Sequence, residues 1–252
     1  SRCRNSFFKF SILRIQFFID YKSYSSKYYC KACTPINEFY TAAADYWKHI
    51  PPTVDGMLGG FGFISQTDIK GSTVFLKLKN PPSKTSALDC GSGIGRITKN
   101  LLLNHFKHVD LVEQNLKFLE VAKTYLKNYS SRTDYYPIGL QNFCFTVKKY
   151  DVIWCQWVLG HLKEDHLIEF LKKYFYRSGL RPNGVIIIKE NVTSSKNLEV
   201  DTKDSSVTRP LSEFYRIFQE SNLICIKEEQ QNKFPRGLYP VYMFALRSVN
   251  EL

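Results

Sequence analysis

The sequence has no internal repeat, no low-complexity tract and no uninterrupted apolar segment as long as a membrane span. These absences argue against a solenoid and predict that no membrane is bound. The apolar stretch over residues 7–19 is short and is interrupted by charges such as Lys9 and Arg14. A single Cys-x-x-Cys pair, Cys30 and Cys33, has no second pair and no histidine nearby, so we expect no zinc site and no other bound metal.

Acidic residues are scarce at the N-terminus. Residues 1–33 hold seven basic residues and one acid, and so carry half of the net charge of +12. The rest of the chain is only modestly basic, so we do not expect its folded part to bind nucleic acid. We expect residues 1–33 to be a disordered extension outside the fold, with a mitochondrial presequence as the alternative because the segment is rich in Arg and Ser. Residues 34–252 suit one domain, with a helical cap over residues 34–80.

Two periodicities of apolar residues predict alternating strands and helices. Strands are expected at residues 87–90, 108–113, 150–155, 184–189, 223–228 and 241–246, with one more before Leu140. Helices are expected at residues 35–49, 72–79, 96–106, 115–129, 163–176 and 210–221. This alternation is typical of a parallel sheet covered on both faces. The glycine-rich residues 55–62 are expected to lack regular structure and to bend over a ligand.

A glycine-rich turn over residues 88–96, with the sequence LDCGSGIGR, joins a predicted strand to a predicted helix. Such a turn lets the backbone approach NAD, FAD or S-adenosylmethionine. Arg96 stands where the dinucleotide fingerprint needs Gly or Ala. Asp89 precedes the first glycine by two positions, and Glu113 ends the next strand, where a carboxylate can accept both ribose hydroxyls. The turn therefore predicts an α/β fold of class I, the Rossmann-like S-adenosylmethionine-dependent methyltransferases, with a seven-stranded and mostly parallel sheet.

Four further segments carry a closer resemblance: YWKHIPPTVDGMLGG at residues 46–60, DVIWCQWVLGHL at 151–162, KEN at 189–191 and DSSVTR at 204–209. Over residues 38–247 the chain resembles the protein N-terminal Xaa-Pro-Lys methyltransferases, which are α-N-methyltransferases. The resemblance implies methylation of the α-amine of proteins whose exposed N-terminus begins Xaa-Pro-Lys. It also implies S-adenosylmethionine as the cofactor and a location in nucleus and cytoplasm.

The turn and the resemblance together predict the site residues. The cofactor contacts are predicted to be Asp89, Gly91, Gly93, Arg96, Glu113, Gln114, Asn115, Leu140, Gln141 and Gln156. The substrate contacts are predicted to be Trp47, Leu58, Ile64, Trp157, Asp201, Ser206 and Tyr239. The guanidinium of Arg96 would pair with the methionine carboxylate of the cofactor. Trp157 offers a flat face to the substrate proline.

Three polar residues are candidates for the chemistry. Methyl transfer to an amine needs a neutral nitrogen, and Asp204 and His161 are the candidate bases. Asn191 could hold the amine or a substrate carbonyl by hydrogen bonding. The alternatives are that His161 packs in the core or caps a helix and that Asp204 serves a turn. Asp201 and Asp204 also offer carboxylates to a lysine at the third substrate position, and such acids would repel a nucleic acid.

Two positions depart from the family pattern. In that family an acid lies two residues before the tyrosine that matches Tyr239, where this chain has Gly237. The aromatic after the glycine pair is often tyrosine, and here it is Phe61. Two other interpretations stay open, namely a methyltransferase acting on a small molecule or RNA and an inactive cofactor-binding adaptor.

Overall fold

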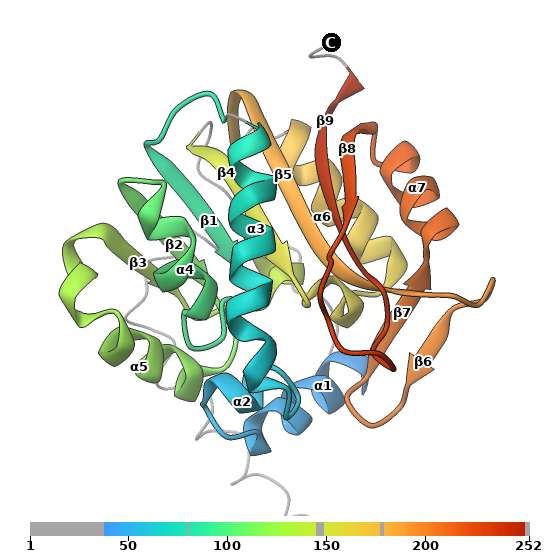
Figure 1. Ribbon diagram of the computed structural model, residues 1–252, viewed down its shortest axis with the longest axis horizontal. Helices are drawn as coiled ribbons and strands as arrows, with labels where there is room; N and C mark the ends of the chain where they lie inside the picture. Colours follow the sequence, from blue (N-terminus) through green and yellow to red (C-terminus); the bar gives the residue numbers. More distant parts are fainter. Residues whose placement is uncertain (1–37, 80, 145–148, 177–178, 250–252) are drawn as a thin grey trace, which may run out of the picture.

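One mixed β-sheet forms the centre of the molecule, with helices on both faces (Figure 1). The computed structural model describes residues 38–79, 81–144, 149–176 and 179–249, so the predicted extension over residues 1–33, with Cys30 and Cys33, lies outside the described residues. Among the described residues, no helix has the length and apolar character needed to cross a membrane.

Five neighbouring strands are parallel, in the order β3-β2-β1-β4-β5, and β9 and β8 complete the sheet in antiparallel pairing beside β5. These strands are β1 (Ser86–Cys90), β2 (His108–Val112), β3 (Thr133–Tyr136), β4 (Tyr150–Gln156), β5 (Leu180–Thr193), β8 (Leu223–Gln230) and β9 (Val241–Ser248). This arrangement confirms the predicted α/β class I fold with a mostly parallel sheet.

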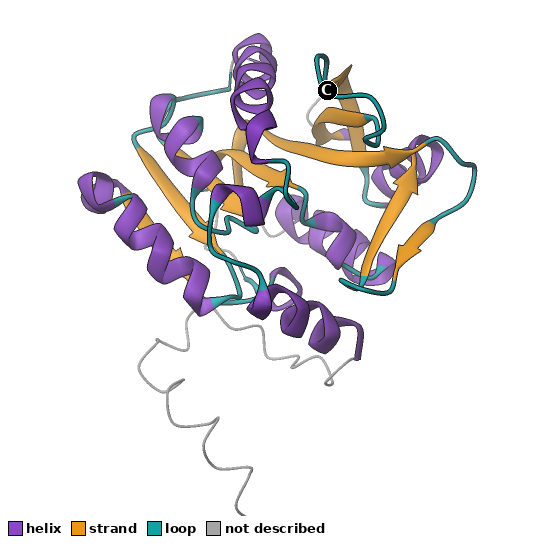
Figure 2. Ribbon diagram, turned by 60° about the horizontal axis from the view of Figure 1, so that its bottom comes forward, coloured by secondary structure: helices purple, strands orange, loops and turns teal. Residues whose placement is uncertain are grey.

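Strands β1, β2 and β4 bury both of their faces, which explains why their sequences are mostly continuous apolar runs. In β4, Val152 and Trp154 join a core with one set of helices, while Ile153 and Cys155 join the core on the opposite face. On the first face lie α3 (Ser65–Lys79), α4 (Arg96–Asn100) and α5 (Leu116–Tyr125); on the second lie α6 (Glu164–Tyr176) and α7 (Leu211–Glu220). Figure 2 shows these two helical layers on either side of the strands.

The sheet has nine strands rather than the predicted seven. The two additional strands are β6 (Glu199–Asp201) and β7 (Ser206–Pro210), an antiparallel hairpin whose second strand pairs in parallel with the end of β5. Sequence periodicity missed this hairpin because β6 is only three residues long and is largely exposed. Its position matters because the turn between β6 and β7 holds Asp204.

The cap differs from the sequence prediction in two places. Residues 55–62 were expected to be irregular, but α2 (Val54–Met57) overlaps them and is capped by Thr53, whose hydroxyl oxygen accepts a hydrogen bond from the amide of Gly56 at 3.0 Å. The helix predicted from residue 72 begins at Ser65 as α3. The apolar periodicity did not reveal the first turns of α3, because the buried face of the helix carries the polar residues Asp68 and Ser72.

Two predicted helices end earlier than expected. α4 stops at Asn100 and is followed by a 3₁₀ turn at Leu102–Asn104, while α5 stops at Tyr125 before a 3₁₀ segment at Lys127–Arg132. The cap helix α1 (Glu38–His49) and α2 lie across the end of the sheet where the parallel strands finish (Figure 1). Ligands of open α/β sheets bind at this carboxyl edge.

Candidate active site

The turn after β1 is shaped by glycines in left-handed conformations. Gly91, Gly93 and Gly95 have φ angles of 67°, 54° and 80°, which residues with a side chain rarely adopt. A Cβ atom on Gly91 would lie 2.4 Å from Val158, and one on Gly93 would lie 2.7 Å from the sulfur of Met57. The turn is therefore closely packed against Val158 and Met57, and both of these residues line the space that the turn borders.

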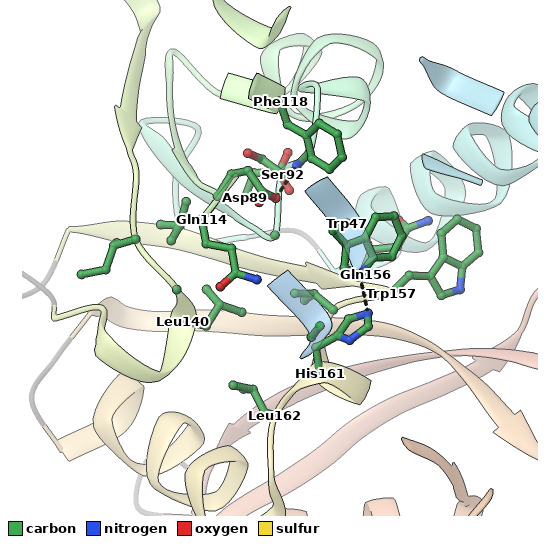
Figure 3. A pocket seen from close by; sticks show the side chains of 18 of the residues that line it. Trp47, Asp89, Ser92, Gln114, Phe118, Leu140, Gln156, Trp157, His161 and Leu162 are labelled. Atoms are coloured by element: carbon green, nitrogen blue, oxygen red, sulfur yellow. Dashed lines mark hydrogen bonds between the residues drawn. The ribbon is translucent and has the colours of Figure 1, made fainter. Parts of the chain in front are cut away.

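That space is the glycine-turn cavity, which lies between the turn, the carboxyl ends of β1, β2 and β4, and helix α1 (Figure 3). Nine of the ten predicted cofactor residues line it: Asp89, Gly91, Gly93, Arg96, Glu113, Gln114, Leu140, Gln141 and Gln156. The tenth, Asn115, lies outside the lining. It caps α5 by accepting hydrogen bonds from the amides of Lys117 and Phe118, and its side-chain amide donates to the carbonyl of Trp47.

Two carboxylates stand at the floor of the glycine-turn cavity. Glu113 accepts hydrogen bonds from the amides of Gly93 at 3.1 Å and Asn115 at 2.8 Å, and burial raises its pKa above the ordinary value in spite of them. Burial also raises the pKa of Asp89 to about 6, although the hydroxyl of Thr98 donates to it at 2.6 Å. Buried acids of this kind are sites where the hydroxyl groups of a ligand can replace lost water.

Behind Arg96 lies a buried polar network centred on Asp68 of α3. Its carboxylate contacts Lys189 at 2.6 Å and Arg96 at 2.7 Å, and it accepts hydrogen bonds from the side chain of Gln156 at 2.9 and 3.0 Å. Burial by itself would raise the pKa of Asp68, but Lys189 and Arg96 outweigh it and hold the pKa below the ordinary value. Asp68 thus joins the cap to two residues that line the glycine-turn cavity.

A second space, the hairpin cavity, shares Trp157 and His161 with the first and is lined by residues of the β6–β7 hairpin. Its walls include the three candidate catalytic residues, Asp204, His161 and Asn191. They also include six of the seven predicted substrate residues: Trp47, Leu58, Ile64, Trp157, Ser206 and Tyr239. The two cavities share four wall residues, which are Trp47, Met57, Trp157 and His161.

Asp201, the seventh predicted substrate residue, does not line the hairpin cavity. It is exposed in β6, where its carboxylate accepts a hydrogen bond from the amide of Lys203 at 2.8 Å. Sequence analysis did not single out Glu199, whose carboxylate accepts a hydrogen bond from the hydroxyl of Tyr239 at 2.5 Å. A carboxylate therefore stands beside Tyr239 even though Gly237 offers none.

Unpaired polar atoms gather around the two cavities. Among the described residues, six buried side-chain polar atoms have no hydrogen-bond partner, and four of these belong to residues that line a cavity: Ser92 Oγ, Trp157 Nε1, His161 Nδ1 and Asp204 Oδ1. Leaving such a group unpaired costs about 1–3 kcal/mol. Their concentration here fits walls that are completed by ligands, and the glycine turn fits a nucleotide-type cofactor such as S-adenosylmethionine.

The loop between the two cavities, residues 157–162, is held by Glu190 and Arg209, which also line the hairpin cavity. Glu190 accepts hydrogen bonds from the amides of Val158 and Leu159, both at 2.8 Å. Arg209 donates to the carbonyl of Leu159 at 3.1 Å and to that of Leu162 at 2.9 Å. This bracing maintains a turn in which Trp157 has the left-handed φ of 52°, an arrangement that costs energy in a residue with a large side chain.

The buried position of Glu190 predicts a pH-dependent stability. Burial raises the pKa of Glu190 from 4.5 to about 7, against the hydrogen bonds from Leu159 and Val158. The pKa of Glu190 is higher in the folded than in the unfolded protein, so Glu190 contributes fully to the free energy of unfolding below pH 4.5. This contribution is lost as the pH rises through 7, and the total loss is about 3 kcal/mol. We expect Glu190→Gln to remove this dependence.

Denaturant unfolding of both proteins at a series of pH values between 4 and 8 measures the effect. The free energy of unfolding of the wild type should fall relative to that of Glu190→Gln across this interval. Titration of Asp89 occurs in both proteins and cancels in the difference. A constant difference across the interval would show that Glu190 ionises normally in the folded protein.

One cluster away from the cavities has metal-ligating atom types. His108, Asp110 and Asp134 place their ligand atoms within 4.8 Å of one another. However, the ammonium of Lys149 lies 2.5 Å from the carboxylate of Asp110, and the hydroxyl of Tyr150 donates to the same oxygen. Since Lys149 already supplies the positive charge, we interpret the cluster as a structural network, and the expectation of no bound metal stays a prediction.

Comparisons with known proteins agree with this geometry. Residues 36–247 match the sequence family described as AdoMet dependent proline di-methyltransferase. N-terminal Xaa-Pro-Lys N-methyltransferase 1 of Danio rerio is 51% identical over 215 residues, which cover 83% of this chain and 95% of that protein. The Homo sapiens protein of the same name is 50% identical over 216 residues, covering 83% and 96%. A solved structure of a SAM-dependent methyltransferase from Leishmania major is 36% identical and superposes with a TM-score of 0.77, covering 83% of each chain.

Proposed function

Because the chain belongs to the family of AdoMet-dependent proline di-methyltransferases, we propose that it transfers methyl groups to the α-amine of proteins that begin with Xaa-Pro-Lys. The family resemblance found in the sequence is confirmed by the close relatives. One observation of the structure carries the proposal: the glycine-turn cavity and the hairpin cavity meet at a common wall of four residues. A methyl donor in one cavity would therefore lie next to an amine in the other.

Bound S-adenosylmethionine supplies the methyl group, which the neutral amine nitrogen receives by in-line displacement from the sulfonium. The residues of this chain must therefore align the amine, and such alignment can supply much of the rate. An α-amine has a pKa of about 7.7–8.0, so a substantial fraction is neutral at physiological pH and a modest base suffices. The amine proton leaves for that base.

The residues that line the two cavities have different roles in the proposed reaction. Arg96 lines the glycine-turn cavity and presents a guanidinium suited to a carboxylate. Glu113 offers acceptors to ribose hydroxyls. In the hairpin cavity, Asn191 can hold the incoming peptide by hydrogen bonding, and the ring of Trp157 can pack against its proline. Asp204 and His161 are the groups able to take up the proton.

A mass-spectrometric assay tests the proposal. The protein, S-adenosylmethionine and a peptide beginning Ser-Pro-Lys are incubated beside the same peptide with an acetylated N-terminus. We expect methyl groups to appear on the free peptide alone, because acetylation removes the nucleophilic amine. The number of methyl groups gained then counts the transfer steps.

The opposite result has a clear meaning if cofactor binding is measured separately by calorimetry. Binding without methylation of any Xaa-Pro-Lys peptide would reject the proposal. It would favour either an adaptor that binds the cofactor without turnover or a methyltransferase for a small molecule or RNA.

A further inference from the structure

The contact between Trp47 and His161 constrains the protons of the imidazole. The indole Nε1 of Trp47 donates a hydrogen bond to Nε2 of His161 at 3.1 Å, with the two rings at 85° to each other (Figure 3). An indole nitrogen is only ever a donor, whereas a histidine nitrogen can be either. Nε2 of His161 is therefore the acceptor, and a neutral ring must carry its single proton on Nδ1.

Trp47 is held firmly enough to impose this choice. It belongs to α1, and its carbonyl accepts a hydrogen bond from the side chain of Asn115 at 3.2 Å. Its ring also makes an edge contact with Phe118, with the centroids 6.4 Å apart. Trp47 is thus positioned by α5 and its N-cap as well as by its own helix, α1.

The other nitrogen of His161 belongs to the hairpin cavity, which Asp204 also lines. Nδ1 of His161 and Oδ1 of Asp204 are both buried and both lack a hydrogen-bond partner, and the two residues line the hairpin cavity. Burial lowers the pKa of His161, while the negative charge of Asp204 and an interaction of the ring with the backbone of Ser205 oppose the shift. The ring is therefore most stable as a neutral donor at Nδ1, and Asp204 is the group with a free acceptor.

We propose that Trp47 fixes His161 in the Nδ1–H tautomer, so that His161 acts as a hydrogen-bond donor in the hairpin cavity and Asp204 accepts the proton of the attacking amine. This inference rests on the proposed function, and it gives the two candidate bases different roles: Asp204 is the base and His161 is a hydrogen-bond donor. The new N–CH₃ bond forms as the C–S bond of the donor breaks, and the proton moves from nitrogen to a carboxylate oxygen of Asp204. Trp47 is a positioning residue, because it acts through His161.

The tautomer can be observed without any turnover. In ¹⁵N NMR of the full-length protein with labelled histidine, the signal of His161, assigned by its loss in His161→Asn, should show a protonated Nδ1 and an unprotonated Nε2. In Trp47→Phe the donor is gone, and this preference should weaken or reverse. Tyr46→Phe, on the same helix, alters an aromatic neighbour of Trp47 but keeps the bond, and the wild-type pattern should persist.

An Nε2–H signal in the wild type would overturn the inference, as would an unchanged pattern in Trp47→Phe. Either result leaves the methylation assay untouched, so failure here is distinguishable from failure of the proposed function. The tautomer itself is read from the spectrum of the wild type, and His161→Asn serves only to assign the signal.

Kinetics of two amide variants give a second test. The side-chain nitrogen of asparagine can take the place of Nδ1, whereas that of glutamine reaches the place of Nε2. If His161 is a donor at Nδ1, His161→Asn should retain roughly threefold to tenfold more kcat than His161→Gln, the factor expected of one neutral hydrogen bond. If His161 were the base, neither amide could accept the proton and both variants would lose kcat equally.

Discussion

Replacing Asp204 by asparagine is expected to lower kcat for an Xaa-Pro-Lys peptide by about 10²- to 10⁴-fold, the usual contribution of a general base. The variant keeps the size of the side chain but removes the acceptor charge from the hairpin cavity. Asp204 does not line the glycine-turn cavity, so the affinity for S-adenosylmethionine should stay close to that of the wild type. Single-turnover rates, together with calorimetric titration of the cofactor, measure both quantities.

Asp201→Asn is the matched control, because it removes one negative charge from the same hairpin. Asp201 is exposed and lies off the cavity wall, so the substitution should alter KM at most and leave kcat unchanged. A long-range electrostatic effect would lower kcat in both variants alike. A kcat of Asp204→Asn within threefold of the wild type would reject Asp204 as the base.

Asp68→Asn is expected to have the second large effect, on stability and on cofactor binding together. Asp68 and Lys189 are both fully buried, and removal of one partner from a buried ion pair costs about 3–5 kcal/mol because the other charge remains uncompensated. Arg96 loses its 2.7 Å partner at the same time, so the affinity for S-adenosylmethionine should fall by roughly tenfold or more, the effect of one charge-assisted hydrogen bond. Denaturant unfolding and calorimetric titration measure the two losses.

Two further variants separate the losses. Ser72→Ala removes only a neutral acceptor of Lys189 and should cost about 1 kcal/mol of stability without weakening the cofactor. The double variant Asp68→Leu with Lys189→Leu removes the buried pair and should recover stability relative to Asp68→Asn. It should not recover cofactor affinity, because Arg96 stays unanchored; full recovery of affinity would show that Asp68 does not position Arg96.

Much of the fold could be predicted because its signals are local. A strand, a glycine turn and a helix follow one another around Gly91, and the acid Glu113 comes directly after the next strand. Both signals can be recognised in the sequence because the local backbone geometry requires particular residue types, such as glycine in the turn. The start of α3 and the β6–β7 hairpin left no such trace, since the buried face of one is polar and the strands of the other are short.

The sequence predicted most residues of the candidate site, but it did not predict the contacts that hold them in place. The family resemblance supplied Asp204 and His161 but not the atoms that join them to the cap. Asp68 went unnoticed, although a signal existed: Lys189 directly follows the apolar residues of β5, and a buried lysine requires an acidic partner. Such a partner can come from anywhere in the sequence, and here it is 121 residues away, so only the folded chain identifies it.

Strand β5 also limits how the length of this chain can vary. Three successive residues of its carboxyl half serve different neighbours: Lys189 reaches Asp68, Glu190 braces the loop on the opposite face, and Asn191 lines the hairpin cavity. Insertion or deletion of a single residue earlier in the strand would exchange the two faces for all three at once. Changes of length are therefore excluded from the buried half of β5 and can accumulate in the exposed residues 194–198 before β6.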